Sequence, residues 1–280
     1  MSKGKRSLKR KDGFRKDRDM GKIKILFPLI VLLIILNLAL GDDSWKDTNQ
    51  SNFHHINVLI YSGSGTSDNC VYQIENCLEQ ANKENYISGV RFTYNTSNII
   101  NNNSLSGYDV VIMPGSSEGY DYLDNEDINE SDLKNYIASG KGFLGICAGA
   151  YSGAEYTENW YSGWGVAPNV INQPYLETGN VTIKTTSAGN LENNDGEWIS
   201  HINGPAMTTY SDVVTFATYN ENSSYQGYAA IVGDHYGEGR SVLSGVHPEL
   251  NPQHAEMLVN LIIWAYNGTY GNNTYNVTSN

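Results

Sequence analysis

Residues 142–156 read GFLGICAGAYSGAEY and place Cys147 between two glycines. The apolar run FLGI leads into the cysteine, and a segment with helical character follows it. The pattern Gly-x-Cys-x-Gly is the thiol counterpart of the nucleophile elbow Gly-x-Ser-x-Gly, a strained strand-to-helix turn that presents its central side chain. The start of the following helix favours a thiolate. Cys147 is therefore a candidate nucleophile, and the alternative is a buried cysteine that only packs beside two glycines.

A thiol nucleophile needs a base, and residues 239–254, GRSVLSGVHPELNPQH, supply a candidate. His247 and Glu249 follow an apolar run and lie two residues apart, so in an extended segment they share one side. The carboxylate can then hold one imidazole nitrogen while the other nitrogen faces the thiol. His-Pro-Glu alone is usually a turn, but together with the elbow it predicts a Cys147, His247, Glu249 triad.

The elements that must position these residues alternate in the first half of the chain. Apolar or alternating runs that begin at His55 and span 90–95, 108–115 and 141–149 predict strands, and stretches that follow Ser67 and span 132–140 predict helices. Strands that alternate with helices indicate a parallel sheet with right-handed crossovers. Beyond Gly179 short strands predominate, which predicts antiparallel additions, and residues 254–266 predict a closing helix.

The N-terminal segment differs from the rest of the chain in charge. Residues 1–24 hold 11 of the 18 basic residues and three of the 30 acidic ones. Residues 25–41 are almost wholly apolar, which predicts a transmembrane anchor or a signal segment, with the basic tail in the cytoplasm and the acidic remainder outside. Ala39-Leu40-Gly41 resembles a signal peptidase site, so anchoring and cleavage both remain open.

The remainder of the chain is typical of an exterior protein. It carries 27 acidic and seven basic residues, which argues against a nucleic-acid partner because phosphate binding needs a basic patch. Its Asn-x-Ser/Thr patterns predict a glycoprotein and begin at Asn49, Asn95, Asn102, Asn129, Asn180, Asn222, Asn267, Asn272 and Asn276.

The other cysteines and histidines give weaker signals. Cys70 and Cys77 lie seven residues apart, about 10 Å on one straight helix, which is too far for a disulfide. Cys70 lies near a helix start and could approach Cys147, so a regulatory disulfide between those two stays open. The histidines at positions 54, 55 and 201 have no Cys or His partner at zinc-like spacing. We therefore predict no metal and no cofactor.

These motifs together resemble the class I glutamine amidotransferase-like superfamily. Within it, the chain is most similar to the family named for the N-terminal domain of biotin-protein ligases. The likeness rests on the elbow and His-Pro-Glu, and on looser motifs at Tyr61 to Thr66, Met113 to Gly115, Phe143 to Tyr151 and Asn203 to Pro205.

The resemblance implies roles for further residues. Backbone NH groups of Gly115, Ser116 and Ala148 would form an oxyanion hole. A substrate cleft would be lined by Tyr61, Ser62, Gly63, Tyr151 and Asn203. Ala150 and Tyr151 stand where amidotransferases usually carry a His-Gln or similar pair that helps to hold glutamine, and no synthetase or biotin ligase catalytic domain is recognised. We therefore expect neither glutamine-driven amination nor biotinylation.

The sequence thus predicts an α/β fold, a flavodoxin-like three-layer sandwich with a central mostly parallel sheet and antiparallel additions, preceded by one transmembrane helix. The expected segments are a cytoplasmic tail (1–24), an anchor or signal (25–41), a linker (42–54), a class I glutamine amidotransferase-like domain (55–268) and an Asn/Thr-rich tail (269–280).

Two functions fit this organisation. One is a membrane-anchored or secreted cysteine hydrolase that acts on a small amide, γ-glutamyl or isopeptide bond of a peptide-like or cell-wall-derived substrate. The other is an inactive extracellular binding or scaffold module of the same fold. The oligomeric state is not indicated by the sequence.

Overall fold

The computed structural model describes residues 53–116, 121–188, 190–210, 212–221 and 223–269. The first half of this region forms a parallel sheet in the order β2-β1-β3-β4. Its strands are β1 (His54–Tyr61), β2 (Val90–Ser97), β3 (Val110–Met113) and β4 (Gly142–Ile146). Strand β13 (Gly239–Ser244) returns from the far end of the chain and pairs in parallel with β4. This pairing places two segments separated by about a hundred residues side by side in the middle of the sheet.

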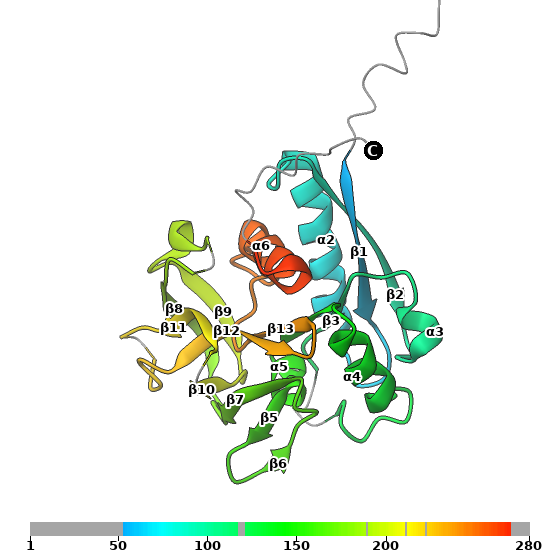
Figure 1. Cartoon of the computed structure of the whole chain (residues 1–280). Coiled ribbons are helices and arrows are strands. Elements are labelled where there is room, and N and C mark those ends of the chain that lie inside the picture. The colour runs from blue at the N-terminus through cyan, green and yellow to red at the C-terminus, as the bar shows by residue number, and fades with distance from the viewer. Residues whose placement is uncertain (1–52, 117–120, 189, 211, 222, 270–280) are drawn as a thin grey trace, which may run out of the picture. The chain divides into compact units, whose positions relative to one another are not determined.

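The sheet continues beyond β13 with mostly antiparallel strands (Figure 1). Next to β13 lie, in order, β12 (Ala229–Tyr236), β10 (Ala206–Thr209), β7 (Ala167–Gln173), β5 (Ala154–Thr157) and β6 (Tyr161–Ser162). Strand β12 also pairs with β11 (Val214–Tyr219), which leads to β8 (Thr178–Thr185) and β9 (Trp198–Ile202). The pair β5 and β7 is parallel, and the other pairs of this half are antiparallel.

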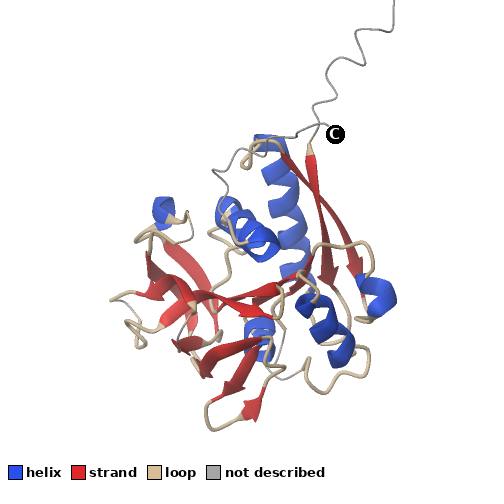
Figure 2. Cartoon of the chain, in the orientation of Figure 1, coloured by secondary structure: helices blue, strands red, loops and turns tan. Residues whose placement is uncertain are grey.

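Helices cover both faces of the parallel strands (Figure 2). On one face α2 (Asp68–Glu84) packs against α6 (Ala255–Asn267), and their apolar residues join those of the strands in one core. On the other face lie α3 (Asn102–Leu105), α4 (Glu130–Ala138) and α5 (Ala148–Gly153), which share a second core. A short 3₁₀ helix spans Glu192–Asn194. Because successive residues of a strand point to opposite faces, β1 places Val58 and Ile60 in the first core and Leu59 and Tyr61 in the second.

The prediction of an α/β mixed sheet with parallel strands is confirmed. Helix α2 begins directly after Ser67, as expected, although the Ser67 side chain makes no capping hydrogen bond. Helix α4 begins at Glu130, two residues before the predicted start, because the Asn129 side chain accepts a hydrogen bond from the Asp132 NH and fixes the first turn. The predicted cytoplasmic tail, anchor and most of the linker, and all but the first residue of the C-terminal tail, lie outside the described residues. Among the described residues, none of the helices has the length and apolar character needed to cross a bilayer.

Candidate functional site

The turn around Cys147 is as sharp as the sequence pattern requires. Strand β4 ends at Ile146 and α5 begins at Ala148, so Cys147 alone makes the connection, with φ of 55° and ψ of −105°. A positive φ is costly for a residue with a side chain, and such strain collects at functional sites. A Cβ atom on Gly149 would lie 2.0 Å from the carbonyl oxygen of Met113, and one on Gly145 would lie 2.3 Å from the oxygen of Gly149. Both glycines are therefore needed so that β3, β4 and α5 can approach one another.

The segment with His-Pro-Glu meets this turn because β13 and β4 are parallel neighbours. Ser244 lies opposite Ile146 in their register, and the Cys147 NH donates to the Ser244 carbonyl oxygen at 2.8 Å. The chain then passes to His247, whose NH donates to the Ser200 carbonyl oxygen of β9 at 2.8 Å. The thiol and the imidazole thus both lie just beyond the carboxyl ends of these parallel strands, where open α/β sheets hold their reactive groups.

His247 and Glu249 form a buried pair. The Nδ1 atom of His247 lies 2.8 Å from Oε1 of Glu249, and the side chains are 2% and 0% exposed. Burial lowers the pKa of His247, but the Glu249 carboxylate and then the Cys147 thiol raise it, and the net result is a pKa well above the ordinary value. The imidazolium form of His247 is therefore favoured.

The other ring nitrogen of His247 faces two sulfur atoms. Nε2 is buried and has no hydrogen-bond partner of ordinary geometry among the described residues. Both the Cys147 and the Cys70 thiols nevertheless lie close enough to interact with the ring and to raise its pKa. Cys147 is 7% exposed, and its thiol donates to the Ile202 carbonyl oxygen at 3.3 Å. The structure therefore brings Cys147, His247 and Glu249 together.

The residues expected at the oxyanion hole surround the same point. A Cβ atom on Gly115 would lie 2.9 Å from Cε1 of His247 and 3.8 Å from Cβ of Cys147. Ala148 is the first residue of α5, so its NH has no partner within the helix. Ser116 is the next residue. It forms an isolated antiparallel β-bridge with Thr66, and its hydroxyl donates to the Asp121 carboxylate at 2.5 Å. Gly115 and Ala148 therefore lie next to Cys147, and Ser116 anchors its own loop.

The three residues predicted to line a substrate cleft after the first strand differ in exposure. Tyr61 is 0% exposed, its ring packs edge-on against Tyr122, and its hydroxyl accepts from Asn125 at 2.8 Å. Tyr61 therefore supports the loop from within the core and cannot contact a ligand in this conformation, which corrects the expectation. Ser62 and Gly63 are partly exposed, and the Ser62 NH continues the pairing with β2 through the Ser97 carbonyl oxygen.

Tyr151 and Asn203 differ in their exposure to solvent. Tyr151 is 3% exposed, and its hydroxyl accepts from the Tyr175 NH at 3.2 Å. Asn203 is exposed, has φ of 53°, and follows Ile202, whose carbonyl oxygen meets the thiol. Asn203 is therefore a residue that a ligand at Cys147 can reach, whereas Tyr151 packs beneath the elbow.

Sequence reasoning missed the role of β9. His201 is fully buried, and its two ring nitrogens lie 2.8 Å from the Glu177 carbonyl oxygen and 3.0 Å from that of Gly204. These contacts fix the turn that carries Ile202 against the thiol. The sequence signal that could have indicated this role is the position of His201 two residues before the motif Asn203-Gly204-Pro205. The nearness of Cys70 to His247 was also missed, because the sequence indicated only an approach to Cys147.

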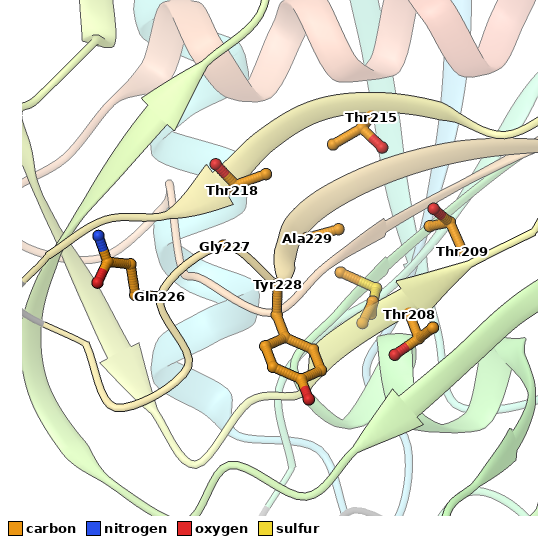
Figure 3. A pocket seen from close by; sticks show the side chains of 9 residues that line it. Thr208, Thr209, Thr215, Thr218, Gln226, Gly227, Tyr228 and Ala229 are labelled. Carbon is orange, nitrogen blue, oxygen red and sulfur yellow. The ribbon is translucent and has the colours of Figure 1, made fainter.

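A large cavity among the described residues lies away from Cys147. It has a volume of about 590 Å³, and none of the proposed catalytic residues lines it. Figure 3 shows threonines from β10 and β11 around it, together with Gln226 and Tyr228. A neighbouring cavity of about 290 Å³ shares Thr208 and Tyr228 and adds Tyr156 and Tyr210. Hydroxyl, amide and aromatic groups thus line a continuous stretch of this surface.

The raised pKa of His247 predicts a pH-dependent contribution to stability. The unfolded residue titrates near about pH 6.5, whereas the folded protein holds the proton to higher pH. The folded state therefore binds more protons in this interval, so the stabilisation is complete below about pH 6.5 and is lost as the pH rises through the folded pKa. We expect the difference in free energy of unfolding between wild type and His247→Gln to shrink from about pH 6 to alkaline pH. Denaturant titrations at several pH values test this, and a difference that grows with pH would contradict it.

Part of the chain is similar to known biotin-protein ligases. Residues 56–163 match the family described as "Biotin-protein ligase, N terminal". The biotin-protein ligase of Schizosaccharomyces pombe is 24% identical over 224 residues, which cover 72% of this chain and 35% of that protein. The chain thus spans about a third of the length of this curated relative. The resemblance to the family named for the N-terminal domain of biotin-protein ligases is confirmed by these matches.

Solved structures with a similar fold include a ThuA-like protein from Bacteroides uniformis. It aligns with a TM-score of 0.52 and 13% identity, over 80% of this chain and 98% of the other. A glutamine amidotransferase from Thermotoga maritima aligns with a TM-score of 0.45 and 16% identity, over 75% of this chain and 82% of the other. The alignment with the ThuA-like protein shows a shared α/β fold.

Proposed function

We propose that this chain, whose residues 56–163 match the N-terminal family of biotin-protein ligases, is a glutamine amidotransferase-like cysteine hydrolase that cleaves a small amide, γ-glutamyl or isopeptide bond. The observation that carries the proposal is the meeting of a strained Cys147 with a buried His247 and Glu249 at the carboxyl ends of two adjacent parallel strands. Burying a carboxylate-imidazole pair costs free energy, and such buried titratable groups are characteristic of functional sites.

The reaction follows from the positions of these groups. The Cys147 thiolate attacks the carbonyl carbon of the amide, and the NH groups of Gly115 and Ala148 stabilise the oxyanion. The His247 imidazolium gives its proton to the departing amine, which leaves a thioester on Cys147. The neutral His247 then takes a proton from water, the hydroxide attacks the thioester, and the carboxylic acid and the thiolate-imidazolium pair are released. Glu249 holds Nδ1–H throughout, so Nε2 is the atom that exchanges the proton.

The narrow access to the thiol supports a small or slender substrate. Cys147 is 7% exposed and His247 only 2%, so a folded protein surface cannot reach them without movement. Ala150 and Tyr151 stand where glutamine amidotransferases usually carry a pair that helps to hold glutamine, and this difference supports a substrate other than glutamine. A peptide-like or cell-wall-derived amide fits both restrictions.

The proposed location is the cell exterior, with the chain anchored by residues 25–41 or released after their cleavage. Support comes from the apolar run beside the basic tail, from the acidic remainder and from its glycosylation patterns. The substrate would then be met outside the membrane.

Hydrolysis in ¹⁸O-labelled water tests the proposed activity. We would incubate the full-length chain, kept in a mild detergent, with γ-glutamyl, isopeptide-linked and cell-wall peptides and analyse the products by mass spectrometry. The expected result is a free amine together with a carboxylate that has gained one ¹⁸O atom. Products without ¹⁸O, or amine transfer to another acceptor, would contradict hydrolysis.

The second candidate function is a binding module without turnover, and the cavities beside Tyr228 favour it. Their threonine hydroxyls, Gln226 amide and tyrosine rings suit a glycan or a peptide. In that case a peptide of the same panel would bind without cleavage, Tyr228→Ala would weaken its binding, and Cys147→Ala would not.

A further inference from the structure

A second thiol lies beside the proposed catalytic pair without a part in the reaction. Cys70 is in the first turn of α2 and is 4% exposed. A Cβ atom on Gly115 would lie 3.1 Å from Sγ of Cys70 and 2.9 Å from Cε1 of His247. Three side chains from distant segments therefore meet beside Gly115, which has no side chain of its own: Cys70, Cys147 and His247.

The donor atoms at this point are those that bind soft metal ions. Sγ of Cys70, a ring nitrogen of His247 and a carboxylate oxygen of Glu249 all lie within 4.8 Å of one another. Cys147 adds a second sulfur that interacts with the same ring. Thiolate and imidazole ligands suit zinc and other transition metals, whereas magnesium and calcium prefer oxygen ligands.

The hydrogen bond between His247 and Glu249 prepares the imidazole for a metal. Because Nδ1 lies 2.8 Å from Oε1 of Glu249, the proton of the neutral ring is fixed on Nδ1 and the lone pair on Nε2. Nε2 is buried and, among the described residues, has no hydrogen-bond partner of ordinary geometry, although both thiols lie close to the ring. A carboxylate that orients a metal-binding histidine in this way is the usual outer shell of a zinc site.

We propose that Cys70, Cys147 and Nε2 of His247 bind one Zn²⁺ ion and that this ion silences the Cys147 nucleophile. Binding places two thiolates and a neutral imidazole on the metal, so Cys70 releases its proton and any proton held on Cys147 or on Nε2 of His247 is released as well. The Cys147 side chain must turn from the Ile202 carbonyl oxygen toward the ring. The fourth position stays open to water. Removal of the ion by a chelator restores the free thiol, so the block is reversible.

Metal titration of the full-length chain tests the site without any substrate. Zn²⁺ would be titrated against a competing chromophoric chelator, and Co²⁺ would replace it to reveal thiolate ligation through the near-ultraviolet charge-transfer band. We expect one ion per chain, and Cys70→Ser should weaken binding by more than about 100-fold, beyond the 10- to 100-fold typical of outer-shell losses. The Co²⁺ band should weaken in Cys70→Ser and in Cys147→Ser.

Cys77 provides the matched control. It lies on the same helix, is 0% exposed and carries a free thiol, yet it is not among the proposed ligands. Cys77→Ser should bind Zn²⁺ as the wild type does, and Cys70→Ala, checked for folding by circular dichroism, should reproduce the loss in Cys70→Ser. The proposal is overturned if the wild type binds no Zn²⁺, if Cys70→Ser binds it normally, or if Cys77→Ser loses it equally. Since binding is read without turnover, a failure of the hydrolase proposal is recognised separately.

Discussion

Replacing Cys147 with alanine is expected to lower the rate of amide hydrolysis by at least about 10⁴-fold, because no thioester can form without the sulfur. The loss should be larger than for any other single side chain of the site. Any hydrolysis that remains in this variant should come only from substrate binding and from the NH groups of Gly115 and Ala148. The measurement is product formation by mass spectrometry at a saturating concentration of the peptide that the wild type cleaves.

The control for this variant is Cys77→Ala. It also removes a buried thiol, but from the core between α2 and the sheet, so it should reduce stability while the rate constant of the folded enzyme stays near that of the wild type. A Cys147→Ala protein that is folded and hydrolyses the peptide at the wild-type rate would remove the cysteine from the mechanism.

Gly149→Ala is expected to lower the free energy of unfolding by about 3 kcal/mol or more, at the upper end of the cost of overpacking. The added Cβ would lie 2.0 Å from the Met113 carbonyl oxygen and 2.9 Å from the Met113 Cβ. Backbone atoms cannot rotate away, so β3 and α5 must separate. Gly149 lies within α5, where alanine favours helix, so any loss comes from the contact and not from helix propensity.

The comparison for this variant is Gly107→Ala. Gly107 has φ of 84°, and an added Cβ would have nothing within 4 Å. Its substitution should cost only the strain of a positive φ, about 1 kcal/mol. Urea unfolding of both variants measures the difference, and equal losses would show that the approach of α5 to β3 tolerates a methyl group.

Much of this arrangement could be predicted because it depends on local patterns. The glycines around Cys147 mark a turn whose sterics admit no Cβ, and the spacing of His247 and Glu249 places both side chains on one side of an extended segment. The continuous apolar runs of β3 and β4 follow from burial of both faces of a parallel sheet.

Other features depend on pairings between distant segments that no local pattern encodes. Strand β9, with the sequence WISHI, alternates poorly and was not predicted, yet its Ile202 carbonyl oxygen meets the thiol. The prediction of no metal rested on ligand spacing along the chain, whereas the fold gathers Cys70 and His247 from positions 177 residues apart. The family resemblance assigns Tyr61 to a cleft-lining loop after the first strand, but Tyr61 is the last residue of β1, and strand alternation turns its side chain into the core.

The rate of alkylation of each cysteine tests the pairing of Cys147 with His247 most directly. The full-length chain would be treated with iodoacetamide near neutral pH after removal of metal by a chelator, and labelling would be followed peptide by peptide in wild type and in His247→Ala. Burial, and secondarily the Glu249 carboxylate, raise the pKa of Cys77 far above its usual range, so Cys77 should remain nearly unlabelled. The account predicts that Cys147 reacts fastest of the three cysteines and that His247→Ala slows it selectively. Labelling of Cys147 as slow as that of Cys77, or unaffected by loss of the imidazole, would contradict the account.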